Sequence, residues 1–403
     1  MNDNSKRTYA DAIQSIDAIH ARDTAEVNPI ARSLLLTHGH KTPRALLLWH
    51  GYTNSPRMYY QLAQKFFDLG YNVWTPRLPH SGFADRMTAD HARLTRAEII
   101  HFANETLDAA RGLGDHLIVG GESLGGVMAA WAAQHRADVD LAVMINAAFA
   151  MHGVPEKLNT LLARIMVRFP NIFMWWDPRQ RGNIGPSHAY PRFATRALAQ
   201  TFLMGAEIYR LAKTQKPAAR SILSITSAKD VAVNNRVIAQ VANRWRAMGA
   251  NISEYQFQGD PAPILHDIID PTQANQNIDY FYPILIDLIT KIQVVTVESH
   301  MAIYQTARFQ VKPGTLEICK QAIREFTDYI RANESETRMY LALNESGDPM
   351  RFMHVFIFEN EAAHQRHSNS DAAKHFSSIL YPNCVAPVEL IDYTLVAENK
   401  VTS

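Results

Sequence analysis

Cysteine is scarce in this 403-residue chain, and neither sign of charge is in excess. The two cysteines, Cys319 and Cys384, are too few for a disulfide framework or a cysteine-rich metal site, and they fit a reducing compartment. Lys and Arg total 40 and Asp and Glu total 39, so the net charge of +1 gives no general electrostatic basis for binding nucleic acid or acidic membranes. A local basic patch is still compatible with this balance.

Long apolar runs are also missing. The N-terminal segment MNDNSKRTYADAIQ lacks the apolar stretch of a signal peptide, and no run of about 18 apolar residues could span a membrane. We therefore expect a cytoplasmic protein with no integral membrane segment. Hydrophobic residues make up 47% of the chain and charged residues 20%, which is typical of a globular protein rather than a disordered one.

Strands and helices are predicted to alternate through residue 292. Short apolar runs bounded by turn residues predict buried parallel strands at 45–49, 71–75, 116–120, 141–145, 221–226 and 252–257. Amphipathic or small-residue stretches predict helices at 8–22, 58–69, 96–111, 127–133, 234–248 and 278–292. This alternation indicates an α/β fold with a mostly parallel sheet and helices on both faces.

Residues 149–214 interrupt the alternation. They are rich in proline and contain a cluster of aromatic residues that includes Phe173, Trp175 and Trp176. We expect this insertion to form a cap over the carboxyl-terminal edge of the sheet.

The pattern changes again near residue 298. Predicted strands at 302–311, 338–344, 352–358 and 388–396 and helices at 315–333, 361–367 and 371–380 follow the order β-α-β-β-α-β of a ferredoxin-like α+β domain. The domains are then 1–44 (an N-terminal helix and the first strands), 45–295 (a catalytic domain) and 298–403. One face of the ferredoxin-like sheet is apolar and not covered by helices, which predicts a homodimer through this domain.

One sequence motif predicts a catalytic residue. Residues 121–125 read Gly-Glu-Ser-Leu-Gly, follow a predicted strand and open a small-residue helix, which is the context of a nucleophile elbow. The flanking glycines allow neighbouring backbone to approach, and the helix N-terminus favours developing negative charge. Ser123 is the predicted nucleophile.

A serine nucleophile needs a base and an acid that orients the base. His266 is the one histidine between Lys229 and Lys291, and it follows the last predicted strand. Asp230 is the first carboxylate after the preceding strand, and Asp260 is its rival. The sequence predicts a triad of Ser123, Asp230 and His266.

An oxyanion hole needs backbone N–H groups beside the nucleophile. Leu124 follows Ser123, and Tyr52 lies in the His50-Gly51-Tyr52-Thr53 turn after an early strand. We predict that Tyr52 and Leu124 supply these groups and that His50 organises the turn.

The segments HGYTNSP, RLPHSG, GGESLGG, SAKD and LHDIIDP together resemble the α/β-hydrolase superfamily over residues 32–292. They look most like its serine carboxylesterase and monoacylglycerol-lipase or lysophospholipase branch. The resemblance implies hydrolysis of small-molecule carboxylic esters through an acyl-enzyme, without a cofactor. Phe173, Trp175 and Trp176 would then contact an apolar acyl group, or would only pack the cap onto the sheet.

Residues 300–398 resemble the antibiotic-biosynthesis-monooxygenase domain, a dimeric α+β fold that includes cofactor-independent quinol oxygenases. The segment FQVKPG, the helix after it and HSNS carry this resemblance. Phe356 and Phe358 replace the acidic residue and the tryptophan often found on the third strand of this family. The alternative function is therefore a bifunctional hydrolase and quinol-type monooxygenase.

Overall fold

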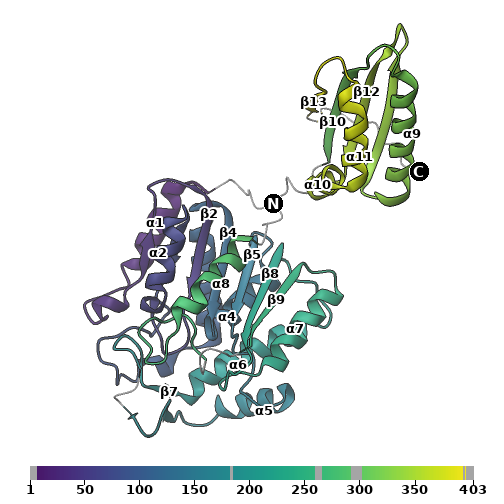
Figure 1. Ribbon diagram of the computed structural model, residues 1–403. Coiled ribbons are helices and arrows are strands. Elements are labelled where there is room, and N and C mark those ends of the chain that lie inside the picture. The colour runs from purple at the N-terminus through teal and green to yellow at the C-terminus, as the bar shows by residue number, and fades with distance from the viewer. Residues whose placement is uncertain (1–6, 182–184, 259–265, 292–301, 394, 396–403) are drawn as a thin grey trace, which may run out of the picture. The chain divides into compact units, whose positions relative to one another are not determined.

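Seven strands form the larger sheet of the structure, a computed structural model that describes residues 7–181, 185–258, 266–291, 302–393 and 395. Their order in the sheet is β1-β3-β2-β4-β5-β8-β9 (Figure 1). The bounds are β1 Leu34–Leu36, β2 Thr42–Trp49, β3 Asn72–Thr75, β4 Gly114–Glu122, β5 Leu141–Ile145, β8 Ser221–Ser227 and β9 Ile252–Phe257. β1 pairs with β3 in the antiparallel sense, and every other neighbouring pair in this order is parallel. The predicted sheet is confirmed.

Helices cover both faces of this sheet, because its strands are apolar on both sides. Leu47 and Trp49 of β2 pack into one hydrophobic core, and Leu46 and Leu48 pack into the other. The first core is closed by α1 Tyr9–His20, α3 Arg96–Ala110, α4 Leu124–His135, α6 Thr195–Leu211 and α7 Asn235–Ala247. The second core is closed by α2 Tyr60–Asp68 and α8 Ile278–Lys291.

The insertion between β5 and β8 contains helices and strands that the sequence analysis did not predict. Helix α5, Glu156–Met166, packs on α6, and strands β6, Phe173–Trp175, and β7, Arg192–Ala194, pair as an antiparallel ribbon. We refer to residues 149–214 as the cap.

The chain divides into two compact units at Val294 and Val295. The second unit is an antiparallel sheet in the order β11-β12-β10-β13, with its helices packed on one face. Its elements are β10 Ile303–Gln310, α9 Leu316–Asn333, β11 Thr337–Glu345, β12 Asp348–Phe358, α10 Glu361–Asn369, α11 Asp371–Leu380 and β13 Glu389–Tyr393. This arrangement confirms the ferredoxin-like prediction.

Both cysteines belong to the second unit, where they are buried and unpaired. Phe309 and Phe352 from the sheet and Phe326 from α9 form its main core. None of the helices described in either unit is long and apolar enough to cross a bilayer.

Candidate active site

Ser123 stands at a sharp turn between β4 and α4. Its backbone has φ of 60° and ψ of −113°, a conformation that costs a residue with a Cβ about 1–3 kcal/mol. The turn closes only because glycines flank it: a Cβ on Gly125 would lie 1.8 Å from the Trp49 carbonyl oxygen, and one on Gly121 would lie 2.4 Å from it. The elbow predicted from the sequence therefore forms, and it leaves Ser123 partly exposed.

Asp230 and His266 are in direct contact. The His266 Nδ1 lies 2.7 Å from Asp230 Oδ2. Asp230 is buried, and its other oxygen accepts hydrogen bonds from the backbone N–H groups of Ala232 at 2.7 Å and Val233 at 3.0 Å. A proton on Nδ1 that bonds to Asp230 leaves Nε2 free to accept a proton. The rival acid, Asp260, lies outside the described residues.

Asn146 fixes the loop that carries His266. Its side-chain N–H donates to the His266 carbonyl oxygen at 2.8 Å, and its Oδ1 accepts from the Ser227 N–H at 2.9 Å. Asn146 is fully buried at the end of β5 and has φ of 42°, so it connects the ends of two strands to the histidine. The sequence analysis missed this residue. Its signal was a polar side chain directly after the apolar run Leu141–Ile145.

Glu122 is a second residue that the sequence analysis missed. Its buried side chain accepts a hydrogen bond from the Ile268 N–H at 2.9 Å. Burial, together with the nearby carboxylate of Asp267, raises the pKa of Glu122 well above its ordinary value. The residue next to Ser123 therefore holds its proton more tightly than an exposed glutamate does.

Tyr52 and Leu124, the predicted oxyanion residues, are both buried and line the same cavity as Ser123. A Cβ on Gly51 would lie 3.5 Å from the Ser123 Cβ, so the backbone of this turn runs beside the serine. Burial lowers the pKa of His50 to about 3, so its ring is neutral. Its Nδ1 donates to the Gly51 carbonyl at 2.8 Å and its Nε2 accepts from the Leu78 N–H at 3.1 Å, which holds the turn in place.

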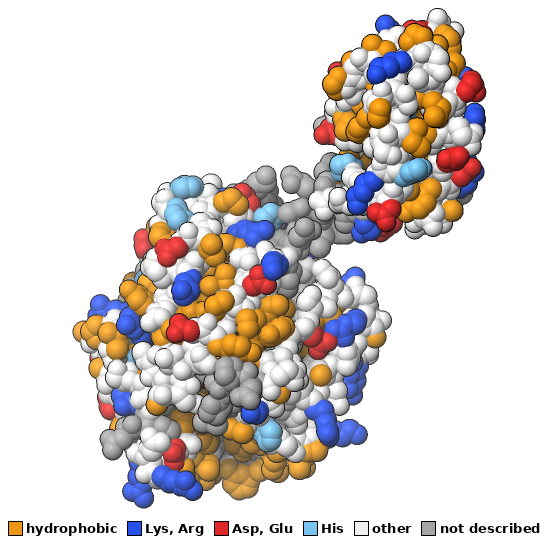
Figure 2. All heavy atoms as spheres, in the orientation of Figure 1, with side chains coloured by type: hydrophobic (Ala, Val, Ile, Leu, Met, Phe, Trp, Pro, Cys, Tyr) orange, Lys and Arg blue, Asp and Glu red, His pale blue; other side chains and the backbone are white. Residues whose placement is uncertain are grey.

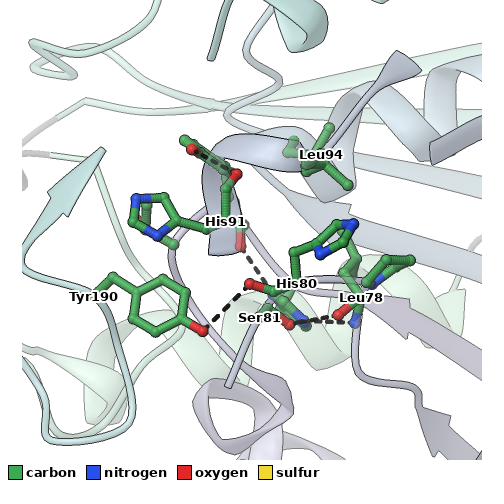
Figure 3. Close-up of a pocket in the computed structure, with 12 residues that line it drawn as sticks. Leu78, His80, Ser81, His91, Leu94 and Tyr190 are labelled. Atoms are coloured by element: carbon green, nitrogen blue, oxygen red, sulfur yellow. Dashed lines mark hydrogen bonds between the residues drawn. The ribbon is translucent and has the colours of Figure 1, made fainter. Parts of the chain in front are cut away.

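A small hollow lies on another side of this turn. Figure 3 shows Leu78, His80, Ser81, His91, Leu94 and Tyr190 around it. The Tyr190 hydroxyl donates to the His80 carbonyl at 3.3 Å, and the Ser81 hydroxyl donates to the Leu78 carbonyl at 2.7 Å. Its volume of about 10 Å³ is room for no more than a water molecule, so it is not a substrate site.

Ser123 and His266 both line a second cavity, of about 580 Å³. Much of its wall is apolar, with Met58, Met151, Trp176, Phe193, Leu198, Phe202, Val231 and Val233. Of the three aromatic residues predicted to contact substrate, Trp176 is in this wall. Phe173 and Trp175 are not among the described lining residues: the Phe173 ring instead lies against His91 and under the guanidinium of Arg192. Their aromatic composition did not reveal which way the rings would face.

A second serine, histidine and aspartate lie together in the structure. His188 of the cap has Nδ1 3.0 Å from Ser55 Oγ and Nε2 3.2 Å from Asp270 Oδ2. Burial alone would raise the pKa of Asp270, but the adjacent His188 lowers that pKa below its ordinary value. All three residues are buried, so this set cannot meet a substrate and instead ties the cap to two loops of the sheet.

Residues 46–291 match the family model described as the alpha/beta hydrolase family. The chain belongs to the alpha/beta hydrolase family. Residues 302–378 match the model described as antibiotic biosynthesis monooxygenase. Both resemblances predicted from the sequence are thus confirmed. No curated protein is a significant match.

Solved structures resemble each unit of this hydrolase. One, reported as "LipS and LipT, two metagenome-derived lipolytic enzymes", is 23% identical, covers 66% of this chain and 99% of that chain, and has a TM-score of 0.49. A soluble variant of the Saccharomyces cerevisiae monoglyceride lipase is 13% identical over 64% of this chain and 90% of that chain, with a TM-score of 0.49. An antibiotic biosynthesis monooxygenase is 18% identical over 24% of this chain and 100% of that chain, with a TM-score of 0.23.

Within the described residues, no group of three or more His, Cys, Asp and Glu side chains is arranged to hold a metal ion. The site itself offers a hydroxyl, an imidazole oriented by a buried carboxylate, and the backbone N–H groups of the elbow and of the His50 turn.

Proposed function

We propose that this alpha/beta hydrolase cleaves carboxylic esters with an apolar acyl group through an acyl-enzyme. The observation that carries the proposal is the 2.7 Å contact between His266 Nδ1 and Asp230 Oδ2 in a site where His266 and Ser123 line one cavity. Monoacylglycerols and lysophospholipid-like esters are the substrate classes that an apolar cavity of about 580 Å³ suits.

In the proposed reaction, Ser123 Oγ attacks the carbonyl carbon of the ester while His266 Nε2 takes the serine proton. The imidazolium that forms is stabilised by Asp230. The oxyanion accepts hydrogen bonds from the backbone N–H groups of Tyr52 and Leu124.

The bond from carbon to the alcohol oxygen then breaks, and His266 returns the proton to the departing alcohol. A water molecule, deprotonated by His266, attacks the acyl-enzyme and releases the carboxylic acid and free Ser123. The described lining includes Asp267 but neither Lys nor Arg. Of the two substrate classes, this favours the neutral glycerol of a monoacylglycerol over the phosphate-bearing alcohol of a lysophospholipid.

The test is Ser123→Ala, compared with Ser253→Ala at an exposed serine on β9 as the matched control. A fluorophosphonate probe should label the wild type and Ser253→Ala and leave Ser123→Ala unlabelled. Hydrolysis of p-nitrophenyl esters of increasing chain length should follow the same pattern. Full hydrolysis by a correctly folded Ser123→Ala variant would disprove the proposal.

We further propose that the second unit forms a homodimer through its open sheet face. Met339, Leu341 and Leu343 of β11 are between 41% and 44% exposed. They pair with Ile357, Val355 and Met353 of β12, so these six apolar side chains point to the same side of the sheet. A surface of this kind is typical of an interface between subunits.

Sedimentation velocity tests the dimer. The wild type should sediment as a dimer, and a double Leu341→Glu and Val355→Glu variant should sediment as a monomer with an unchanged circular dichroism spectrum. A monomeric wild type at micromolar concentration would refute this part of the proposal.

His354 supports a second candidate function, oxidation of a quinol by the second unit. The ring is buried, its Nδ1 lies 2.9 Å from the Tyr340 hydroxyl, and its Nε2 has no hydrogen-bond partner among the described residues. Burial lowers the pKa of His354 to about 4, so the ring is neutral at pH 7 and can form a hydrogen bond with a quinol without carrying a charge. The test is oxygen consumption by the full chain with a panel of quinols. Oxygen consumption that is abolished in His354→Ala would support this function. The absence of oxygen consumption with every quinol of the panel would refute it.

A further inference from the structure

The cap exposes seven large apolar side chains in a stretch of 19 residues. Each is between 41% and 63% exposed. The residues are Leu158, Leu161, Ile165, Phe169, Ile172, Met174 and Trp176. We call this set the cap surface. Figure 2 shows hydrophobic side chains, with Lys and Arg nearby, along the lower edge of the larger unit, where Figure 1 labels α5 and β7.

The spacing of these residues places them on two outward faces. Leu158, Leu161 and Ile165 are three and four residues apart, so they share one face of α5, while Asn159 and Ala163 of the same helix are buried. Ile172, Met174 and Trp176 alternate along β6 and its ends, so they share one face of that strand. Both elements therefore turn apolar side chains toward solvent.

An excess of positive charge is concentrated in the cap, the same region that exposes these apolar side chains. Residues 149–214 contain nine Lys and Arg and three Asp and Glu, a net charge of +6 in a chain whose total is +1. The exposed basic side chains nearest in sequence to the cap surface are Lys157, Arg164, Arg168, Arg179, Arg181 and Arg196. None of these six forms an ion pair within the described part of the chain.

Basic side chains also flank the apolar face of α5. Lys157 and Arg164 are seven residues apart and therefore lie on one side of the helix, adjacent to the face that carries Leu158 and Leu161. Apolar side chains beside a row of positive charges suit the boundary between the acyl chains and the anionic headgroups of a lipid bilayer.

We propose that the cap surface docks on bilayers that contain anionic lipids. Its apolar side chains enter the outer acyl region, and its Lys and Arg side chains contact the headgroups. A second copy of the same surface is disfavoured because two caps of charge +6 would repel each other. Trp176 belongs both to the cap surface and to the wall of the 580 Å³ cavity, so a docked cap would bring the cavity to the lipid.

Vesicle co-sedimentation of the full chain tests the proposal. With vesicles of phosphatidylcholine and phosphatidylglycerol we expect binding that is at least tenfold tighter than with phosphatidylcholine alone, and that weakens as salt is added. Docking does not rest on the proposed ester hydrolysis. Ser123→Ala should therefore bind vesicles like the wild type, so failure of one proposal leaves the other standing.

Two double variants separate the apolar and the charged contributions. Leu161→Gln with Ile165→Gln, and Arg164→Gln with Arg168→Gln, should each weaken binding at least tenfold. The matched control is Leu69→Gln, since Leu69 is 55% exposed at the end of α2, outside the cap. None of the four cap positions is a described lining residue of the cavity, so hydrolysis of a soluble short-chain ester reports correct folding. Absence of binding to either vesicle, equal binding by the variants, or self-association of the cap in place of lipid binding would overturn the proposal.

Discussion

The Glu122 side chain accepts a 2.9 Å hydrogen bond from the backbone N–H of Ile268, so the residue before Ser123 holds the loop that carries His266. The Tyr59 hydroxyl accepts from the Glu122 N–H at 2.9 Å and donates to the Trp49 carbonyl at 3.2 Å, which fixes the other side of the same residue. Glu122 is in this way a positioning residue between the two halves of the candidate active site.

Replacing Glu122 should separate its hydrogen bond from its charge. Glu122→Ala leaves the Ile268 N–H without its acceptor, a loss that costs about 1–3 kcal/mol, and it should lower kcat roughly tenfold or more with little change in KM. Glu122→Gln keeps an acceptor oxygen and should retain most of the activity. Steady-state kinetics on a p-nitrophenyl ester measures both. Equal kcat for the Ala variant and the wild type would show that this bond does not position His266.

The stability of the protein should depend on pH through the same residue. Because burial and Asp267 raise the pKa of Glu122 above its ordinary 4.5, the folded state holds a proton that the unfolded state releases above that pH. The stabilisation that comes from this proton is complete below pH 4.5 and is lost as the pH rises toward the folded pKa.

Glu122→Gln cannot ionise, so its advantage over the wild type in the free energy of unfolding should be near zero below pH 4.5 and should grow with pH. Each unit of raised pKa corresponds to about 1.4 kcal/mol. Urea denaturation of both proteins between pH 4 and pH 9 measures the difference. A difference that does not change with pH would contradict a raised pKa for Glu122.

Asp230→Asn should reduce kcat by roughly 10³- to 10⁴-fold, because an amide cannot stabilise the imidazolium or hold the correct tautomer of His266. The comparison is Asp260→Asn, the rival acid of the sequence analysis, which should retain near-normal activity. If Asp260→Asn lost activity and Asp230→Asn kept it, Asp260 would be the acid that orients His266. Fluorescence or circular dichroism spectra of both variants check that the fold is kept.

Gly125→Ala should destabilise the first unit strongly, by about 3 kcal/mol or more, because its Cβ would lie 1.8 Å from the Trp49 carbonyl oxygen and backbone must move. Gly347→Ala is the control, since a Cβ there meets nothing within 4 Å and should change stability little. Thermal unfolding measures both. A Tm for Gly125→Ala within about 2 °C of the wild type would mean that the backbone of Gly125 does not lie this close to the Trp49 carbonyl oxygen.

Much of the fold could be predicted from local sequence. Apolar runs such as Leu141–Ile145 read as strands because side chains on both faces are buried, and the pattern is contained in five residues. The position of Ser123, Asp230 and His266 after successive predicted strands is what predicts them as a triad. The structure brings Asp230 and His266 into contact, and the roles of all three in catalysis stay predictions.

The missed features depend on contacts between residues far apart in the chain. The bond of Glu122 reaches a loop 146 positions away, and that of Asn146 reaches 120 positions, so no local pattern reports either. The orientations of Phe173 and Trp175 depend on what the cap packs against. The net charge of +1 for the whole chain does not reveal the cap, because the +6 of residues 149–214 is offset by an excess of acidic residues in the rest of the chain.

The place of the two cysteines has a practical consequence. Cys319 and Cys384 are buried in the second unit, and the sequence of the first unit contains none. A single cysteine introduced at an exposed position such as Leu161 would therefore be the preferred target of a thiol-reactive dye, without removal of the native thiols. An environment-sensitive fluorophore at that position would report directly whether the cap leaves water when lipid is added.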